Sequence, residues 1–405
     1  MRKWLVIISL FAACMLAQAQ TDSLRLGYVV RGTVVDAATG KPLESVHVSI
    51  PGRKQATVTN ADGIFTLKSN RPIQTVECSF LGYRTQRQKA AEGRLRIGLH
   101  RENLQIQEAS IIFGDPRSVI EAAVDRIPYS YCTEPQLLEC FYRETLKKQS
   151  RYTYVAEAVA RMYKSAYNGF IYNDAAALEK SRVLVSQRRS DTLSVKTQGG
   201  PTMAISMDLV KNTSVLFSRE EMDLYGYQML QPAYIGDRLQ FVVHMYPVAQ
   251  PDYALYDCMV YIDREYLTFT RIEASLDMSN QAKATRMMLI SKPLTLRFFP
   301  KECSVILNYR LEEGKTRLEY CRTTMRFACD WRKRLFRTQY TAVNELVITD
   351  VRPQAQPIRR QDRFRTQDFL PDKAPDFYDP GFWTDYNIIE PSESLEHAIK
   401  RLRKK

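Results

Sequence analysis

Residues 29–50, VVRGTVVDAATGKPLESVHVSI, carry the pattern that decides the fold of the N-terminal region. Apolar or small residues occupy every second position at 30–34 and again at 46–50, on either side of a turn-rich segment at 38–42. A period of two on both sides of a Gly/Pro turn predicts two half-buried β-strands. The alternation continues along the chain to Leu99, so we predict a β-sandwich of about seven short strands.

Three linked elements of this region carry a family resemblance: residues 32–52 (GTVVDAATGKPLESVHVSIPG), 57–67 (TVTNADGIFTL) and 78–84 (CSFLGYR). They resemble the carboxypeptidase regulatory-like domain, a transthyretin-like β-sandwich common at the N-termini of Bacteroidetes cell-envelope proteins. The resemblance covers residues 28–113 and implies an accessory, non-catalytic role beside other partners. The positions that we interpret as structural turns or close approaches of the backbone are Gly32, Gly40, Pro42, Asp62, Gly63 and Gly82.

The histidines decide whether the chain carries a metallocarboxypeptidase. They are His47, His100, His244 and His397. None has glutamate three residues later, and none belongs to an H-E-x-x-H motif, so the usual zinc ligands are absent from the sequence. G-x-S-x-G, P-loop and dinucleotide-binding motifs are absent as well. We therefore expect no catalytic residue, no metal and no cofactor, and we interpret His47 as a solvent-facing strand residue.

The N-terminus predicts export. Arg2 and Lys3 precede an apolar run at 4–16, and Ala17-Gln18-Ala19 follows, which is typical of a signal peptide over residues 1–19. The alternative is a lipoprotein modified at Cys14. No later stretch approaches the length of a spanning helix. We predict secretion across the inner membrane into the periplasm, with association with the outer membrane as an open alternative and no transmembrane segment after signal removal.

The charge balance bears on partners. Loss of Arg2 and Lys3 with the signal leaves 56 basic and 45 acidic residues, a net charge of +11. In the envelope this predicts an anionic lipid, a glycan or an acidic envelope protein as partner, and not nucleic acid. A purely solubilising surface charge is the alternative. Seven cysteines remain without a C-x-x-C pair, which favours buried free thiols; Cys132–Cys140 is the most plausible bridge.

Residues 114–350 predict a second, β-rich domain. Asp115 and Pro116 predict a helix start, with Pro128 as its end. Strand, polar turn and strand then alternate to about residue 350, which predicts one antiparallel β-meander that forms a curved sheet or half-barrel. The fold class is thus mainly β. The pattern resembles the half-barrel of lipoprotein-carrier-like periplasmic proteins, and the piece that follows the sandwich in larger Bacteroidetes outer-membrane proteins.

Residues 351–405 predict an extended strap, anchored by aromatic side chains, and a short amphipathic C-terminal helix. Five arginines of this strap form a possible site for anionic surfaces: Arg352, Arg359, Arg360, Arg363 and Arg365. A solvated segment that pairs with the acidic stretch 368–396 is the alternative. Thr192, in an Asp-Thr-Leu tripeptide, matches a short O-glycosylation acceptor.

Three function classes remain open from the sequence. The leading hypothesis is a non-enzymatic periplasmic accessory or binding protein that serves envelope assembly or transport. A second is a carrier for a lipid or acyl chain, if the half-barrel encloses an apolar cavity. A third is a hydrolase that uses paired carboxylates such as Asp257 and Asp263, which needs no motif visible in one sequence.

Overall fold

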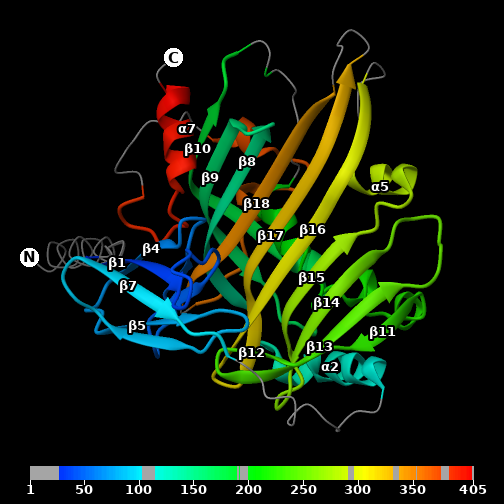
Figure 1. The fold of residues 1–405 in the computed structure, drawn as a ribbon, viewed down its shortest axis with the longest axis horizontal. Helices are drawn as coiled ribbons and strands as arrows, with labels where there is room; N and C mark the ends of the chain where they lie inside the picture. Colours follow the sequence, from blue (N-terminus) through cyan, green and yellow to red (C-terminus); the bar gives the residue numbers. More distant parts are fainter. Residues whose placement is uncertain are drawn as a thin grey trace, which may run out of the picture.

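The computed structural model describes residues 27–102, 115–188, 191, 199–290, 296–331, 337–352, 354–374 and 383–403. The predicted signal peptide, the last part of the family resemblance at 103–113, and Thr192 lie outside these residues. The fold is mainly β, as predicted, and consists of a small sandwich and one large open sheet (Figure 1).

Seven strands in two sheets form the N-terminal sandwich, which confirms the fold predicted from the alternating pattern. One sheet has the order β4-β1-β7 and the other β3-β2-β5-β6. The strands are β1 (Tyr28–Asp36), β2 (His47–Ser49), β3 (Ala56–Val58), β4 (Ile64–Ser69), β5 (Thr75–Ser79), β6 (Gln86–Lys89) and β7 (Arg94–Leu99). Valine, leucine and phenylalanine side chains from both sheets fill the core between them.

The tight turn before β4 shows why particular residues are required. Asn60 Oδ1 accepts hydrogen bonds from the backbone N–H groups of Asp62 and Ile64, both at 2.9 Å. Gly63 has φ +71°, in the left-handed region that favours glycine. A Cβ atom at Gly63 would lie only 2.4 Å from the carbonyl oxygen of Val34. The turn therefore excludes a side chain at this position.

We expect Gly63→Val to lower the free energy of unfolding by about 1–3 kcal/mol, because it adds a backbone clash to an unfavourable φ. Gly52→Val is the matched control, since Gly52 has φ +70° but a Cβ atom at this position would have no neighbouring atom within 4 Å. Chemical denaturation of both variants measures the difference. Equal losses in the two variants would show that the contact with Val34 has no energetic consequence.

The second domain is an 11-stranded antiparallel sheet with the order β10-β9-β8-β18-β17-β16-β15-β14-β13-β11, in which β12 also pairs with β13. Its strands are β8 (Gln136–Lys148), β9 (Arg151–Lys164), β10 (Ala175–Val185), β11 (Tyr225–Met229), β12 (Ala233–Ile235), β13 (Arg238–Pro247), β14 (Tyr256–Asp263), β15 (Phe269–Leu276), β16 (Leu296–Glu312), β17 (Lys315–Trp331) and β18 (Thr338–Arg352).

The expectation of a single meander was wrong in one respect. The sheet contains two meanders, β8 to β10 and β11 to β18, which join because the first strand β8 pairs with the last strand β18. Register pairs run from Tyr340↔Lys148 to Arg352↔Leu137. Alternation within a strand identifies its two faces but not its neighbour, so this long-range pairing could not be read from the pattern.

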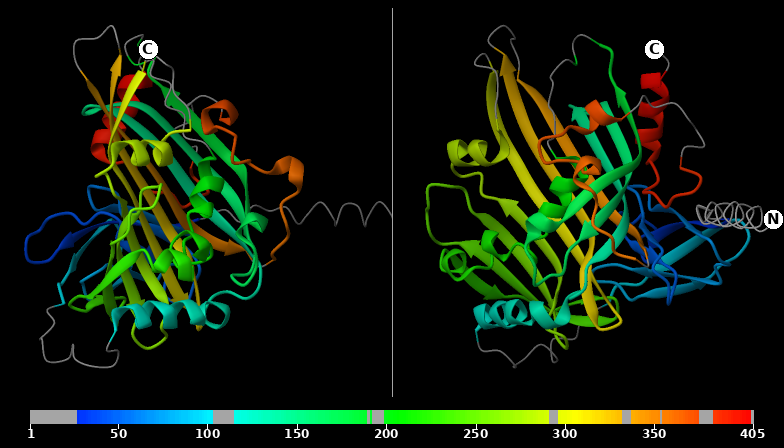
Figure 2. Two further views of the ribbon diagram at one scale, coloured as in Figure 1. Left: turned by 90° about the vertical axis from the view of Figure 1, so that its right-hand side faces the viewer. Right: turned by 180° about the vertical axis from the view of Figure 1, so that it is seen from behind.

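The inner face of the sheet is covered by segments of the chain itself. In Figure 2, the helices and coil at 199–224, together with the strap at 354–374, cross the face opposite to the sandwich. The helical elements of the fold are α2 (Pro116–Ser130), η3 (Ile171–Asn173), α3 (Gly200–Ser206), η5 (Thr213–Val215), α4 (Arg219–Met222), α5 (Gln281–Met288), η6 (Arg360–Asp362), α6 (Leu370–Lys373) and α7 (Glu393–Arg403). Asp115 caps α2 as predicted, but the helix continues past Pro128 to Ser130.

The outer face of the sheet carries the sandwich and the C-terminal clamp, by which we mean residues 383–403. The Nζ of Lys68 in the sandwich donates to the backbone oxygens of Trp383 and Tyr386, at 2.5 and 2.8 Å. Asn387 exchanges two hydrogen bonds with the backbone of Lys68, as a neighbouring strand would. On the sheet side, Trp383 packs edge-on against Phe141. The clamp therefore fastens the two domains to each other.

The remaining features of the described residues concern membrane-spanning helices and the pairing of cysteines. The described residues contain no helix that is long and apolar enough to cross a membrane. All seven cysteines after the predicted signal are free, including Cys132 and Cys140.

Candidate functional site

A polar cleft of about 250 Å³ lies between the sandwich and the outer face of the sheet. Strands β2 and β5 and residues 79–87 form one wall, and the turn that connects β12 and β13 stands beside them. The floor consists of side chains from β13 to β17. We call this space the interdomain cleft. The sandwich is held over it by backbone contacts such as Gly82 N–H to Tyr234 O at 2.8 Å.

His47 and Glu319 form the main charged contact in the cleft. His47 Nε2 lies 2.7 Å from Glu319 Oε1, and Arg310 Nη1 lies 3.5 Å from the same oxygen. Burial alone would raise the pKa of Glu319, but the positive charge of His47, followed by that of Arg310, lowers it to about 2. The interpretation of His47 as solvent-facing was therefore wrong, because only 15% of its side chain is exposed.

Other ion pairs line the same space. Arg238 Nε donates to the buried carboxylate of Asp263 at 2.6 Å, and Arg87 pairs with Glu77 at 2.7 Å. Two lining atoms, Thr85 Oγ1 and Arg238 Nη2, are buried and have no hydrogen-bond partner among the described residues. Buried polar atoms are usually satisfied, so these two atoms are exceptions beside the cleft. The lining, which balances acids against bases, suits an uncharged or zwitterionic polar ligand.

The five arginines of the predicted anionic site do not form one group. Arg352 lies at the end of β18 and pairs with Glu139 and Glu179, at 3.0 and 2.9 Å. The other four lie on the strap that covers the inner face. Three of them lie between the buried residues Ile358 and Phe364, and Arg365 directly follows Phe364. Their contacts are Arg359 with Asp362, Arg365 with Asp368, and Arg363 Nε to Ile358 O, while Arg360 is exposed. Binding to an anionic surface stays a prediction.

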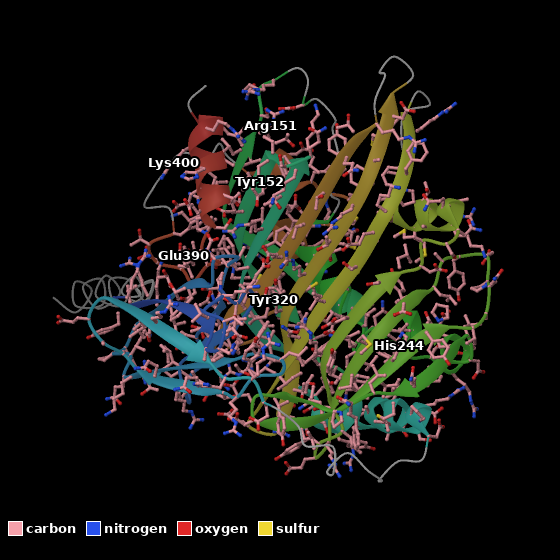
Figure 3. All side chains as sticks on the ribbon, in the orientation of Figure 1. Arg151, Tyr152, His244, Tyr320, Glu390 and Lys400 are labelled. Atoms are coloured by element: carbon pink, nitrogen blue, oxygen red, sulfur yellow. The ribbon has the colours of Figure 1, made fainter. Side chains whose placement is uncertain are left out.

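The paired acids proposed for a hydrolase lie far apart. Asp257 and Asp263 are six positions apart on the same strand, a separation of roughly 20 Å at the usual rise per residue. Glycosidase carboxyls stand at most about 10 Å apart. The carboxylate of Asp263 pairs with Arg238 and accepts hydrogen bonds from two backbone N–H groups of the following turn. Asp257 pairs with His244 at 3.1 Å. His244 lies well away from the sandwich (Figure 3). This pair does not form a carboxylate active site.

The described residues contain no cluster of histidine, cysteine and acidic side chains that could hold a metal ion. The glycines and proline chosen from the sequence lie in the sandwich as turns or close contacts. Gly40 and Gly82 have positive φ, Pro42 pairs with Val35 in an isolated bridge, and a Cβ at Gly32 would lie 2.6 Å from the Phe65 ring.

Glu144 is buried on the inner face, and no cation among the described residues forms a salt bridge with its carboxylate. Its carboxylate accepts hydrogen bonds from the hydroxyls of Tyr142 and Tyr154, at 3.0 and 2.8 Å. Burial raises the pKa of Glu144 to about 7, although both tyrosine hydrogen bonds act against the shift. The raised pKa means that the folded state binds the proton more tightly than the unfolded chain does.

We therefore expect stability to fall by about 3 kcal/mol as the pH rises from near 4.5 through 7, because folding penalises the ionised form. Glu144→Gln should remove this loss, so the variant should gain on the wild type at pH 8 but not at pH 4. Urea unfolding at both pH values measures it, with Glu396→Gln on the exposed side of α7 as control. A constant difference at both pH values would contradict the assignment.

Comparison with known proteins supports the first domain. Residues 30–110 match the family model of the CarboxypepD_reg-like domain. This confirms the domain predicted from the sequence. No curated protein matches the chain.

Solved structures give only distant similarities. A LolA superfamily protein from Nitrosomonas europaea is 13% identical, with 60% of this chain and 96% of that chain covered and a TM-score of 0.21. A DUF1329 family protein from Desulfovibrio piger is 8% identical, with 58% and 93% covered and a TM-score of 0.23. Scores this low carry no property of those proteins to this chain.

Proposed function

We propose that this protein is a non-enzymatic binding protein of the bacterial cell envelope, and that it binds a small polar ligand in the interdomain cleft. The observation that carries the proposal is the cleft itself, whose walls come from both domains. Its lining includes polar and charged side chains of both domains, among them Thr85, Arg238 and the fixed His47–Glu319 pair. A concave site with a few fixed polar groups is typical of ligand sites between domains.

The domain composition supports the same role. The CarboxypepD_reg-like domain is of a regulatory, non-catalytic type. The sequence before it has the pattern of a signal peptide, which supports an envelope location. In this proposal the sandwich supplies one wall of a binding site and the sheet supplies the floor.

A lipid or acyl-chain carrier is less well supported. The apolar inner face of the sheet, which would have to hold the chain, packs against the protein's own segments. Tyr142, Ala158 and Met162 are buried in one continuous core with Ile205 and Leu209 of the covering segment. Apolar side chains that already bury each other leave no surface for an acyl chain without displacement of that segment.

Native mass spectrometry of protein purified from its own envelope tests the proposal. We expect a small molecule to co-purify with the wild type, and we expect the fraction of protein that carries it to be lower in Arg87→Glu. Arg84→Glu is the matched control, because both arginines are 69% exposed and pair with a sandwich glutamate, but only Arg87 lines the cleft. Absence of any bound mass, or equal occupancy in the two variants, would contradict a ligand in the cleft.

A further inference from the structure

Four charged side chains lie together beneath the inner face of the sheet, away from the interdomain cleft. Lys164 ends β9 and Asp174 precedes β10, while Asp208 and Lys211 belong to the segment between α3 and η5. Lys211 Nζ lies 2.6 Å from Asp174 Oδ1, and Lys164 Nζ lies 2.7 Å from Asp208 Oδ2. None of these side chains is more than 3% exposed. Water is therefore excluded from both contacts.

The two pairs differ in how they are satisfied. Asp208 also accepts hydrogen bonds from the hydroxyls of Tyr167 and Tyr309, at 2.9 and 2.8 Å. Its partner Lys164 reaches a second carboxylate, that of Asp174, at 3.3 Å. The opposing charges of Asp208 and Asp174 outweigh burial and raise the pKa of Lys164. This pair is thus held in its ionised form.

Lys211 is in the opposite situation. Burial, followed by the positive charge of Lys164, lowers the pKa of Lys211. A neutral amine is a nucleophile, whereas an ammonium is not. The amine is also held in place, because Lys211 Nζ contacts Ser165 O at 2.6 Å and Ser165 Oγ at 2.8 Å. The nucleophile is therefore oriented at the carboxyl group of Asp174.

Hydrogen-bond donors already surround one oxygen of Asp174, Oδ1, which would become negatively charged if an amine attacked the carboxyl carbon. Ser165 N–H and Ser165 Oγ–H both donate to Asp174 Oδ1, at 2.8 and 2.9 Å. Fixed donors of this kind stabilise the oxyanion of a tetrahedral intermediate. The Lys164 ammonium stands at the other oxygen, Oδ2, where a leaving group needs a proton.

We propose that Lys211 and Asp174 condense to an intramolecular amide. A proton passes from the Lys211 ammonium to Asp174 Oδ2, with Lys164 as the acid that delivers it and is then reprotonated. The free amine attacks Cγ, so the Nζ–Cγ bond forms and Oδ1 carries the negative charge. The Cγ–Oδ2 bond then breaks, and Oδ2 leaves as water with a second proton from Nζ. Ammonium and carboxylate thus give one amide and one water, without an oxidant or a further reactant.

The bond would tie the segment that covers the inner face to the sheet. Lys211 lies in that segment, and Asp174 lies directly before the edge strand β10. Two reactive groups that are held together in a dry site react as if each were present at a very high concentration. Condensation is therefore favoured between Lys211 and Asp174 and not elsewhere on the chain. The covering segment would then remain tethered to β10 even when the domain unfolds.

Intact-mass measurement of the denatured full chain tests the amide. We expect the wild type to weigh one water less than its sequence, and a tryptic digest to contain a branched peptide that joins Lys211 to Asp174. Lys211→Met and Asp174→Ala should each restore the full mass. Lys148→Met is the control, because Lys148 is also largely buried beside an aspartate, Asp191, and its loss should leave the missing water unchanged.

Three results would overturn the proposal. The first is a wild type of full sequence mass. The second is a missing water that persists in Lys211→Met, which would indicate a cyclic imide at an aspartate. The third is a branched peptide that joins Lys164 to Asp208. Because the wild-type mass and the branched peptide decide the matter alone, the test stands even if the variants do not fold.

Discussion

Glu157→Ala is expected to lower the free energy of unfolding by about 3–5 kcal/mol, because it leaves buried guanidinium groups without their counter-charge. Glu157 lies on the outer face of β9, between Arg143 and Arg182, each of which approaches one carboxylate oxygen at 2.7 Å. The side chains of all three residues are at most 10% exposed. The arginines cannot regain hydration without opening the domain interface.

The same carboxylate also orders the C-terminal clamp. Trp383 Nε1 donates to Glu157 Oε2 at 3.2 Å, and the Arg182 guanidinium lies over the Trp383 ring at 4.9 Å. Arg143 Nη2 donates to the backbone oxygen of Ile389 at 2.5 Å. Loss of the carboxylate should therefore loosen the contact between sandwich and sheet in addition to destabilising the sheet.

Urea unfolding followed by circular dichroism measures the stability loss, and hydrogen exchange at 383–403 measures the loosening. Glu157→Gln should lose less than Glu157→Ala, since its amide oxygen still accepts a hydrogen bond from one of the two arginines. Glu396→Ala is the control, because the side chain of Glu396 is exposed and pairs with Lys400 at 3.8 Å, and such exposed pairs contribute little. A loss below about 1 kcal/mol in Glu157→Ala would contradict a buried charge triad.

Glu157 also marks the limit of what alternation reveals. In YTYVAEAVARMYK the glutamate falls on the face opposite to the alanines, so a half-buried strand would expose it. In the structure both faces are covered, the inner one by α3 and the strap and the outer one by the sandwich and the clamp. The pattern identifies which face a strand buries, but it cannot reveal a second cover from a distant part of the chain.

The interdomain cleft could not be predicted from the sequence for the same reason, since distant parts of the chain form its two sides. The alternation puts His47 on the side of its strand opposite to the sandwich core, but the partner that buries it, Glu319, comes from β17 of the other domain. Turn residues behaved differently, because the hydrogen bonds of Asn60 and the positive φ of Gly63 belong to one five-residue segment, 60–64. Local geometry could thus be predicted, whereas a cleft assembled from two domains could not.

The buried Lys164–Asp208 pair gives a second expectation of similar size. We expect Asp208→Ala to cost about 3–5 kcal/mol, because it removes the nearest counter-charge of Lys164 and leaves two buried tyrosine hydroxyls without their acceptor. The residual contact of Lys164 with Asp174, at 3.3 Å, is longer and cannot replace it. The segment between α3 and η5 should be the first to lose protection against hydrogen exchange, since Asp208 fixes it to the sheet.

A double-mutant comparison separates an unpaired charge from a mere packing defect. If the loss in Asp208→Ala arises from the stranded ammonium, then Lys164→Met in the same chain should recover part of it, because no buried charge is left unbalanced at that contact. If the loss arises from the cavity alone, the second change should add to the first. Asp208→Asn is a third variant for comparison. It removes the charge and keeps one acceptor oxygen, enough for one of the two hydroxyls of Tyr167 and Tyr309. A stability close to the wild type in Asp208→Asn would mean that the hydrogen bonds, and not the ion pair, hold this segment on the inner face.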